Sequence, residues 1–358
     1  MQEHTWPDVL GSLIAREDLS PASASWAMQR IMTGEASPDR IAGFVMALQT
    51  KGVSVSELVG IADEMLAHAR RIDVPAPSLD IVGTGGDRQN TVNISTMSAI
   101  VAASAGATVV KHGNRAASSK SGTADCLEAL GVVLSLGPEL VVEVARRVGI
   151  TFCFAQDFHP SMRHAAGPRR ELGVPTVFNL LGPLTNPAQP TFAAVGVAAL
   201  PAAPLVAGVF ASRGRDAAVF RGRDGLDELT VTGPSDVWWV RDGSVMQYVA
   251  DPAEVGLGTH SLESLRGGEP EENAQVVRDL LAGDSEGRMA AVRDAVLLNA
   301  GIALTVVHDG ETTTVGDQET FVEGLRGGVE RAGAAIDSGA AADKLRQWTE
   351  ASREVDPG

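Results

Sequence analysis

Beyond residue 78 the chain alternates short apolar runs with amphipathic helical patterns, and this alternation constrains the fold more than any other feature. The apolar runs predict strands over the following ranges: 79–82, 107–111, 151–154, 192–197 and 216–220. The patterns between and after them predict helices over 95–105, 122–130, 138–148, 202–212, 273–282 and 287–303. Strand and helix in turn, with few hairpins, predict a mostly parallel sheet joined by crossover helices. A hairpin is expected only around Asp242-Gly243.

The first part of the chain has a different pattern. Residues 1–74 are helical in periodicity, and the proline-rich stretch 73–78 marks a boundary. The segment at roughly 160–188 interrupts the strand–helix rhythm, which indicates that the chain rejoins the helices there. We therefore predict an α/β protein with a small helical domain (1–74, rejoined by roughly 160–188) and a larger α/β domain (75–159 and 189–358).

Composition excludes several classes of function. The net charge of −16 argues against nucleic acid as a partner, because an acidic protein repels a polyanion. No apolar run approaches the length of a membrane span, and the N-terminal residues lack a signal-peptide pattern. The two cysteines, Cys126 and Cys153, lie in apolar context and are expected to be buried free thiols. Together these features predict a cytoplasmic protein without a membrane partner.

A glycine-rich loop follows the first predicted strand, in the sequence LDIVGTGGDRQNTVNIS (79–95). It is not a P-loop, because Gly86 is followed by Asp87 and not by lysine. It is not a dinucleotide fingerprint either, because Arg88 stands where a glycine is required. Bare backbone and short polar side chains just before a helix still favour an anionic ligand. Asp87 would repel a lone phosphate, so a sugar hydroxyl, a turn amide or a nearby metal ion explains it better.

Two further stretches carry polar groups of the same kind. The sequence KHGNRAASSKSG (111–122) again follows a strand and precedes a helix, and Lys111 is a mobile charge suited to phosphate. Two such loops indicate a ligand with two separated phosphate groups. His112 could act as a general base, but a histidine that packs or hydrogen-bonds is the favoured interpretation. Asp227 and Glu228 are hard oxygen ligands of the type that Mg²⁺ prefers, although such a pair is often only a solvated loop.

Seven motifs in order resemble the anthranilate phosphoribosyltransferase family, and the resemblance covers essentially the full chain. They are GTGGD (83–87), NIST (93–96), KHGNRAASS (111–119), HPSMRH (159–164), RRELG (169–173), FNLLGPLTNPA (178–188) and DGLDEL (224–229). The resemblance implies a helical domain and an α/β domain of the pyrimidine nucleoside phosphorylase type, and a homodimer formed through the helical domain. It implies transfer of 5-phosphoribose from phosphoribosyl pyrophosphate (PRPP) to the amine of anthranilate, a step of tryptophan biosynthesis, with two Mg²⁺ ions per active site.

The resemblance also assigns site residues. For PRPP they are Gly83, Gly86, Asp87, Thr91, Asn93, Ile94, Ser95, Thr96, Lys111, His112, Gly113, Asn114, Arg115, Ala116, Ala117, Ser118, Ser119 and Thr123. For anthranilate they are Gly83, Asn114, Arg169 and Gly182, and for the metal they are Ser95, Asp227 and Glu228. Arg170 is the alternative to Arg169, but neighbours on a helix point in different directions. Pro168 departs from the family's wording, and a proline there is expected to kink the helix and re-aim the arginine. No side-chain nucleophile or general base is expected, because positioning and electrostatic stabilisation dominate.

Three other interpretations remain at this stage. A pyrimidine nucleoside phosphorylase would share the fold, but the NRAASS and NLLGPLTNP motifs are foreign to that family. A non-catalytic relative that binds nucleic acid would need a basic face, which the net charge opposes. A structural paralogue with a decayed acceptor site would differ from an active enzyme only in its reaction with anthranilate.

Overall fold

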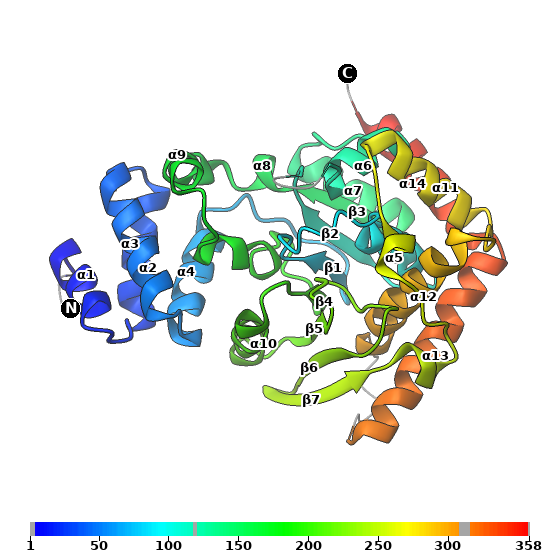
Figure 1. Ribbon diagram of the computed structural model, residues 1–358. Coiled ribbons are helices and arrows are strands. Elements are labelled where there is room, and N and C mark those ends of the chain that lie inside the picture. The colour runs from blue at the N-terminus through cyan, green and yellow to red at the C-terminus, as the bar shows by residue number, and fades with distance from the viewer. Residues whose placement is uncertain (1–3, 117–119, 308–315, 357–358) are drawn as a thin grey trace.

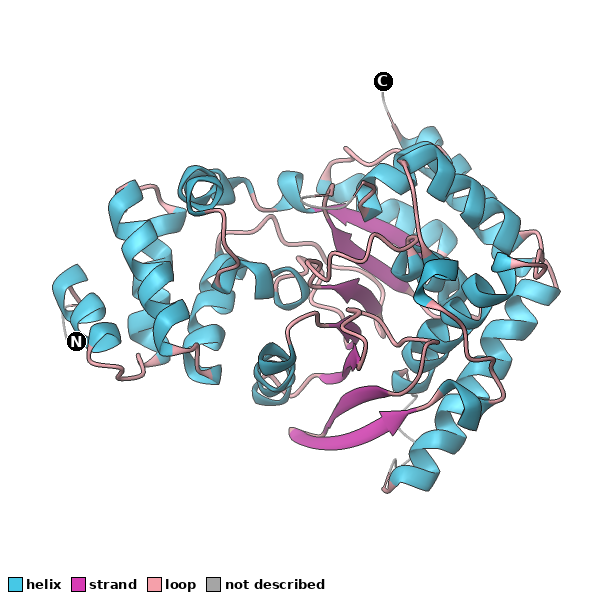
Figure 2. Ribbon diagram, in the orientation of Figure 1, coloured by secondary structure: helices cyan, strands magenta, loops and turns pink. Residues whose placement is uncertain are grey.

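The computed structural model of the chain describes residues 4–116, 120–307 and 316–356. A seven-stranded sheet lies at the centre, in the order β3-β2-β1-β4-β5-β6-β7 (Figures 1 and 2). Five strands pair in parallel: β1 (Leu79–Gly83), β2 (Val109–Gly113), β3 (Ile150–Phe154), β4 (Phe192–Gly196) and β5 (Asp216–Gly222). The predicted mostly parallel sheet is therefore confirmed. β6 (Ser235–Arg241) and β7 (Ser244–Ala250) form an antiparallel hairpin at one edge, which confirms the predicted hairpin.

One face of the sheet is covered by a layer of helices, on the right in Figure 1. They are α5 (Ile94–Ser104), α6 (Thr123–Leu130), α7 (Pro138–Val148), α11 (Pro270–Leu281), α12 (Arg288–Val306), α13 (Gln318–Asp337) and α14 (Ala340–Val355). Their apolar side chains and alternate residues of the strands, such as Ile81 and Ala194, form one buried core. This alternation follows from the pleat, because successive side chains of a strand point to opposite faces.

The other face carries α10 (Ala203–Ser212) and meets the N-terminal helices. These are α1 (Trp6–Ile14), α2 (Pro21–Met32), α3 (Pro38–Lys51) and α4 (Val55–Ala67). Each begins where a threonine or serine side chain accepts a hydrogen bond from a backbone N–H of the first turn, which stabilises the helix start. Their core continues without interruption to Val82 and Val195 of the sheet.

The chain returns to the N-terminal helices after β3. α8 (Ala155–Phe158) leads to α9 (Arg163–Leu172), which packs against α2 and α3. Two 3₁₀ turns, η2 (Val177–Leu180) and η3 (Gly182–Leu184), then bring the chain back to the sheet. This segment therefore touches both the N-terminal helices and the sheet.

Most predicted elements differ from the observed ones by a few residues, and the exceptions have physical causes. The predicted strand 107–111 begins two residues later and extends to Gly113. The sequence did not predict the long helices α13 and α14. They carry many glycines, alanines and charges, so the apolar periodicity on which a helix prediction depends is weak.

The expectation that no apolar run approaches the length of a membrane span is wrong for α12. Among the described residues, α12 is the helix that is long and apolar enough to cross a membrane. It is mostly buried inside the protein, where it packs against α5 and α13. An apolar helix in the centre of a folded core has the same composition.

Candidate active site

The loops that follow the parallel strands meet at the carboxyl edge of the sheet. β1 ends at Gly83 and β4 at Gly196, and these two residues are partners in the strand register. A side chain at either glycine would overlap Asp227: at Gly83 its carboxylate, and at Gly196 its backbone carbonyl. The two glycines therefore leave the space that the loop carrying Asp227 and Glu228 occupies. The prediction singled out Gly83 but not Gly196.

Asp227 contacts the glycine loop directly. Its Oδ2 accepts a hydrogen bond from the backbone N–H of Gly85 at 2.6 Å. Gly85 and Gly86 have φ values of +69° and +89°, which a glycine adopts without strain. Burial raises the pKa of Asp227 to about 7, and the nearby charge of Asp87 contributes to this rise. The three predicted residues Gly86, Asp87 and Asp227 thus belong to one constellation.

Glu228 lies between Asp227 and the start of α5. Burial and the charge of Asp227 raise its pKa well above the usual value, while Lys111 and the backbone N–H of Ser95 oppose the shift. The negative charges of Asp87, Asp227 and Glu228 are thus opposed mainly by one positive charge, the ammonium group of Lys111. Such an excess of negative charge is relieved when a cation binds.

The donor set fits Mg²⁺, because carboxylates and a hydroxyl are hard oxygen ligands. Among the residues that the structure describes, no group of three or more His, Cys, Asp or Glu side chains is arranged to hold a metal ion. Mg²⁺ does not need such a cage, since it commonly binds one or two carboxylates together with substrate phosphates and water. Asp227, Glu228 and the Ser95 hydroxyl are the protein groups that can supply these ligands.

A buried asparagine that the sequence did not suggest fixes this acidic loop from behind. Asn299 of α12 is 1% exposed. Its Oδ1 accepts from the Leu229 N–H at 2.9 Å, and its Nδ2 donates to the Leu229 carbonyl at 2.8 Å. Leu229 follows Glu228 directly, so the side-chain amide of Asn299 fixes the position of the acidic pair, Asp227 and Glu228. The one available signal was a polar residue within the apolar run of α12.

Lys111 lies beneath the acidic pair and does not extend from the loop. It is 1% exposed, and its Nζ donates to the carbonyl of Ile81 and, at 3.2 Å, to the Ser95 Oγ. Burial lowers its pKa, and the charges of Asp80 and Glu228 oppose this. The prediction that Lys111 carries a mobile charge is therefore wrong, because β2 extends past Lys111 and directs the side chain inward.

The second loop is held by α6. The Arg115 guanidinium pairs with Glu128, with Nη2 2.8 Å from Oε1, and with Asp125 at 3.1 Å. The other oxygen of Asp125 accepts from the backbone N–H groups of Ala116 and Gly122, both at 2.9 Å. Arg115 thus faces α6 in this structure.

The remaining predicted residues of this loop fall into two groups. Gly113 and Asn114 precede Arg115, and Thr123 opens α6 beside Gly113. Ala117, Ser118 and Ser119 lie outside the described residues.

Asn93 connects the two loops. Its Oδ1 accepts from the Nδ2 of Asn273 on α11 at 2.8 Å and from the Ser121 Oγ at 3.3 Å. Thr91 pairs with Arg266 in an isolated antiparallel bridge. The first turn of α5 follows, with Ile94, Ser95 and Thr96, so its backbone N–H groups lie between the loops. Thr96 is 1% exposed and its Oγ1 has no hydrogen-bond partner among the described residues.

Arg169, the predicted anthranilate ligand, lies on α9. The helix runs through Pro168 without ending there, and Arg169 places its guanidinium 5.3 Å from the centre of the Phe178 ring. Burial lowers the pKa of Arg169, and among the described residues no carboxylate pairs with it. Arg170, the alternative, is exposed. An arginine without a carboxylate partner, partly removed from water, is suited to an anionic ligand.

Two histidines join β2 to the segment around η3. The His112 Nδ1 lies 3.0 Å from the Gly182 carbonyl, the His159 Nε2 lies 2.9 Å from the Thr185 carbonyl, and the ring centres are 5.1 Å apart. His112 therefore packs and hydrogen-bonds, as the favoured interpretation expected. Burial lowers its pKa to about 3 and that of His159 to about 4, so both rings are neutral at pH 7.

This pair is expected to make the protein sensitive to mild acid. Between pH 6.5 and these lowered pKa values the unfolded histidines bind protons and the folded ones do not, so the free energy of unfolding falls as the pH falls. Replacing His159 by glutamine, which retains an N–H donor for Thr185, should reduce the loss between pH 7.5 and 5.5 by about 1 kcal/mol. Urea unfolding at the two pH values measures this. An unchanged loss in the His159→Gln variant would contradict it.

Comparisons with known proteins agree with this architecture. The family model described as "Glycosyl transferase family, a/b domain" matches residues 76–342, and its helical bundle domain matches residues 7–69. Anthranilate phosphoribosyltransferase from Nocardioides sp. is 56% identical over 348 residues, which cover 97% of this chain and 99% of the relative. That from Thermobifida fusca is 54% identical over 99% of this chain and 98% of the relative.

Solved structures give the same result. The crystal structure of the Thermus thermophilus anthranilate phosphoribosyltransferase has a TM-score of 0.87 and 42% identity, and covers 97% of this chain and 99% of its own. The Saccharomyces cerevisiae anthranilate phosphoribosyltransferase, in complex with PRPP and Mg, has a TM-score of 0.86 and 28% identity, with 99% of both chains covered.

The helical bundle, the α/β domain and the acidic site at the strand ends define a glycosyltransferase. The sequence identity with relatives over nearly the full length shows which glycosyltransferase family this is. The chain belongs to the anthranilate phosphoribosyltransferase family.

Proposed function

We propose that the carboxyl edge of the sheet is the active site at which 5-phosphoribose passes from PRPP to the amine of anthranilate. The products are N-(5-phosphoribosyl)anthranilate and pyrophosphate, a step of L-tryptophan biosynthesis. The observation that carries this proposal is the position of Asp227 and Glu228 directly over the glycine ends of β1 and β4, between both loops. This places a cation site where a doubly phosphorylated sugar can contact the two loops at once.

The donor side would hold PRPP through backbone and short side chains. Asn93 to Thr96 offer the start of α5 to the pyrophosphate, and the backbone of Gly83 and Gly86 supplies further contacts. Lys111 adds positive charge from beneath Ser95. Arg115 contributes its backbone, since its guanidinium is bound to α6.

Ser95, Asp227 and Glu228 would hold Mg²⁺, and we expect two ions. When bound, the metal neutralises the leaving pyrophosphate. The Asn299 amide and the two glycines keep the carboxylates in place, so little reorganisation is required as positive charge develops on the ribose ring. We assign no side chain as nucleophile or general base, because the aromatic amine is already neutral at pH 7.

On the acceptor side, Arg169 would bind the carboxylate of anthranilate, with Asn114 and Gly182 beside the ring. The Phe178 ring beneath the guanidinium holds it in one orientation. A planar guanidinium matches a planar carboxylate in geometry. Because α9 packs against α2 and α3, a carboxylate held by Arg169 would lie on the side of the N-terminal helices.

The proposed reaction has a direct test. Anthranilate fluorescence should disappear when the protein, Mg²⁺, PRPP and anthranilate are mixed, and it should persist when PRPP is omitted. In a separate assay, release of the free base from a pyrimidine nucleoside in the presence of inorganic phosphate would instead indicate the nucleoside phosphorylase alternative.

Arg169→Ala is expected to raise the KM for anthranilate by about ten- to hundredfold, with a small effect on the KM for PRPP. A hydrogen bond between charged groups contributes about 1.5–3 kcal/mol, which corresponds to this range. Steady-state kinetics with each substrate varied in turn measure the two constants. Arg170→Ala is the matched control, because this neighbour is exposed. Equal effects on both substrates would assign Arg169 a structural role.

We further propose that the protein is a cytoplasmic homodimer formed through the helical domain, and that its domains divide as predicted from the sequence. In support, Ile14 at the end of α1 is 77% exposed, which is unusual for a large apolar side chain. Light scattering on the purified protein would give twice the 37.2 kDa chain mass.

A further inference from the structure

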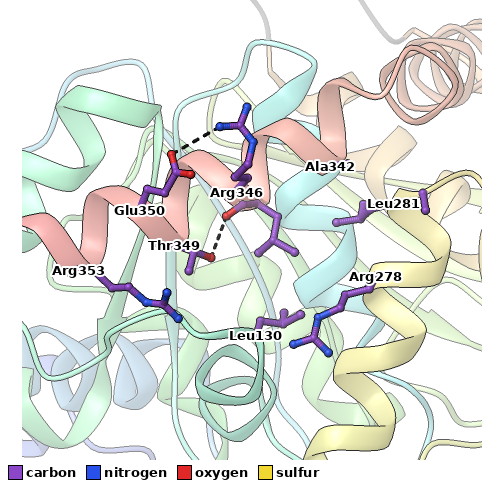
Figure 3. Close-up of a pocket in the computed structure, with 10 residues that line it drawn as sticks. Leu130, Arg278, Leu281, Ala342, Arg346, Thr349, Glu350 and Arg353 are labelled. Atoms are coloured by element: carbon purple, nitrogen blue, oxygen red, sulfur yellow. Dashed lines mark hydrogen bonds and ion pairs between the residues drawn. The ribbon is translucent and has the colours of Figure 1, made fainter.

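A pocket of about 410 Å³ lies outside the set of proposed active-site residues, between α6, α11 and α14 (Figure 3). Its apolar part consists of Leu130, Leu281, Ala342 and Leu345. This volume is in the range of small-molecule sites, which are typically apolar with a few convergent polar groups. Here the polar groups are three arginines, Thr349 and Glu350.

Two of these arginines reach into the pocket from opposite walls. Figure 3 shows the guanidinium groups of Arg278 on α11 and Arg353 on α14 on either side of Leu130, whereas Arg346 turns toward Glu350. Among the residues that the structure describes, no carboxylate forms an ion pair with Arg278 or Arg353. Other arginines, such as Arg115, Arg213 and Arg223, do pair with acids.

Capping of α6 explains only part of this arrangement. The Arg278 Nη2 donates to the Ala129 carbonyl at 2.8 Å, and the Arg353 Nε donates to the Gly131 carbonyl at 3.2 Å. Such bonds satisfy carbonyls at a helix C-terminus. Each guanidinium has five N–H donors, so most of them remain for another acceptor. Both side chains are exposed, and an anion that lies between the two guanidinium groups would be attracted by both.

We propose that this pocket is a second binding site, for a small carboxylate attached to an apolar body, and that its occupancy tightens the binding of PRPP. The carboxylate would lie between Arg278 and Arg353, where each guanidinium can offer two parallel N–H groups. The apolar body would lie against Ala342 and Leu345, which are exposed and half-buried, and thereby remove their surface from water.

The link to PRPP, which rests on the proposed function, follows from the two helices that form the pocket. At the other end of α6, Asp125 holds the backbone of Ala116 and Gly122 in the second loop. Near the start of α11, Asn273 holds Asn93 in the first loop. A ligand that bridges the helices would hold both loops in the arrangement that PRPP needs, and would lower the cost of ordering them.

The binding site can be tested without catalysis, by calorimetric titration of the full chain with hexanoate as the probe. We expect saturable binding in the millimolar range, and binding at least about tenfold weaker for hexanamide, which has the same shape without the charge. Ala342→Trp, which fills the pocket and leaves both arginines, should abolish binding. The double variant Arg278→Ala/Arg353→Ala should weaken it at least about tenfold. Arg169→Ala should bind as the wild type does, because that arginine belongs to the acceptor site.

Hexanoate binding that is unchanged in Ala342→Trp, or is lost in Arg169→Ala, would overturn the proposed site. The link is tested by titrating PRPP with Mg²⁺ at saturating hexanoate, where we expect about fivefold tighter binding, absent in Ala342→Trp. Unchanged PRPP affinity despite bound hexanoate would overturn the link. Failure of PRPP to bind at all would instead count against the proposed function, because the hexanoate titration does not depend on it.

Discussion

Replacing Glu228 by alanine should lower turnover by about 10²–10³-fold at fixed Mg²⁺. Removal of one preorganised electrostatic group from an active site has effects of this size. The carboxylate is held between Asp227 and the start of α5, and its pKa is raised by burial and by the charge of Asp227. In the proposed function, a bound cation would offset the repulsion between these two neighbouring carboxylates. The loss should be partly reversed as the Mg²⁺ concentration is raised.

Initial rates at several Mg²⁺ concentrations measure this effect. Glu319→Ala is the matched control, because this glutamate lies exposed in the first turn of α13. Circular dichroism separates loss of turnover from loss of fold. Rates like those of the wild type in Glu228→Ala would remove Glu228 from the metal site.

Gly196→Ala is expected to reduce activity at least about a hundredfold, although it adds only a methyl group. A Cβ at Gly196 would overlap the backbone carbonyl of Asp227, and neither the end of β4 nor that carbonyl can move aside as a side chain can. The acidic loop must then shift away from the strand ends, and displacement of a reacting group by about 1 Å can cost about a hundredfold in rate. Overpacking of this kind also destabilises the fold by about 1–3 kcal/mol.

The control for this variant is Gly43→Ala, an exposed position of α3 where an added Cβ meets no atom within 4 Å. That change should leave activity intact and should slightly stabilise the helix. Steady-state rates and urea unfolding of both variants provide the comparison. Full activity in Gly196→Ala would show that the acidic loop does not need its observed position.

The sequence was sufficient for the local elements because each carries its own signal. Short apolar runs predicted the parallel strands, and the glycines after β1 predicted a ligand loop. The acidic pair at 227–228 became informative only with the family resemblance, since its spacing alone also describes a solvated loop. These features depend on residues that are near one another in the chain.

The remainder depends on contacts between distant residues. Asn299 is 70 positions from Leu229, and nothing in either segment indicates that they pair. Lys111 was expected as the last residue of the strand 107–111, with a mobile side chain, but β2 continues to Gly113, so the lysine lies within the strand and its side chain points into the protein. The pairing of Arg115 with Asp125 and Glu128 likewise requires the position of α6.

The three-way contact at Asn93 has a consequence for any attempt to shorten the protein. Its amide oxygen receives donors from Ser121 and from Asn273, which lie 28 and 180 positions away. No continuous fragment shorter than about half of the chain contains all three. A truncated protein that ends before α11 would retain every motif proposed to bind the sugar, but it would lose Asn273, which holds Asn93. We therefore expect that no N-terminal fragment ending before α11 is fully active.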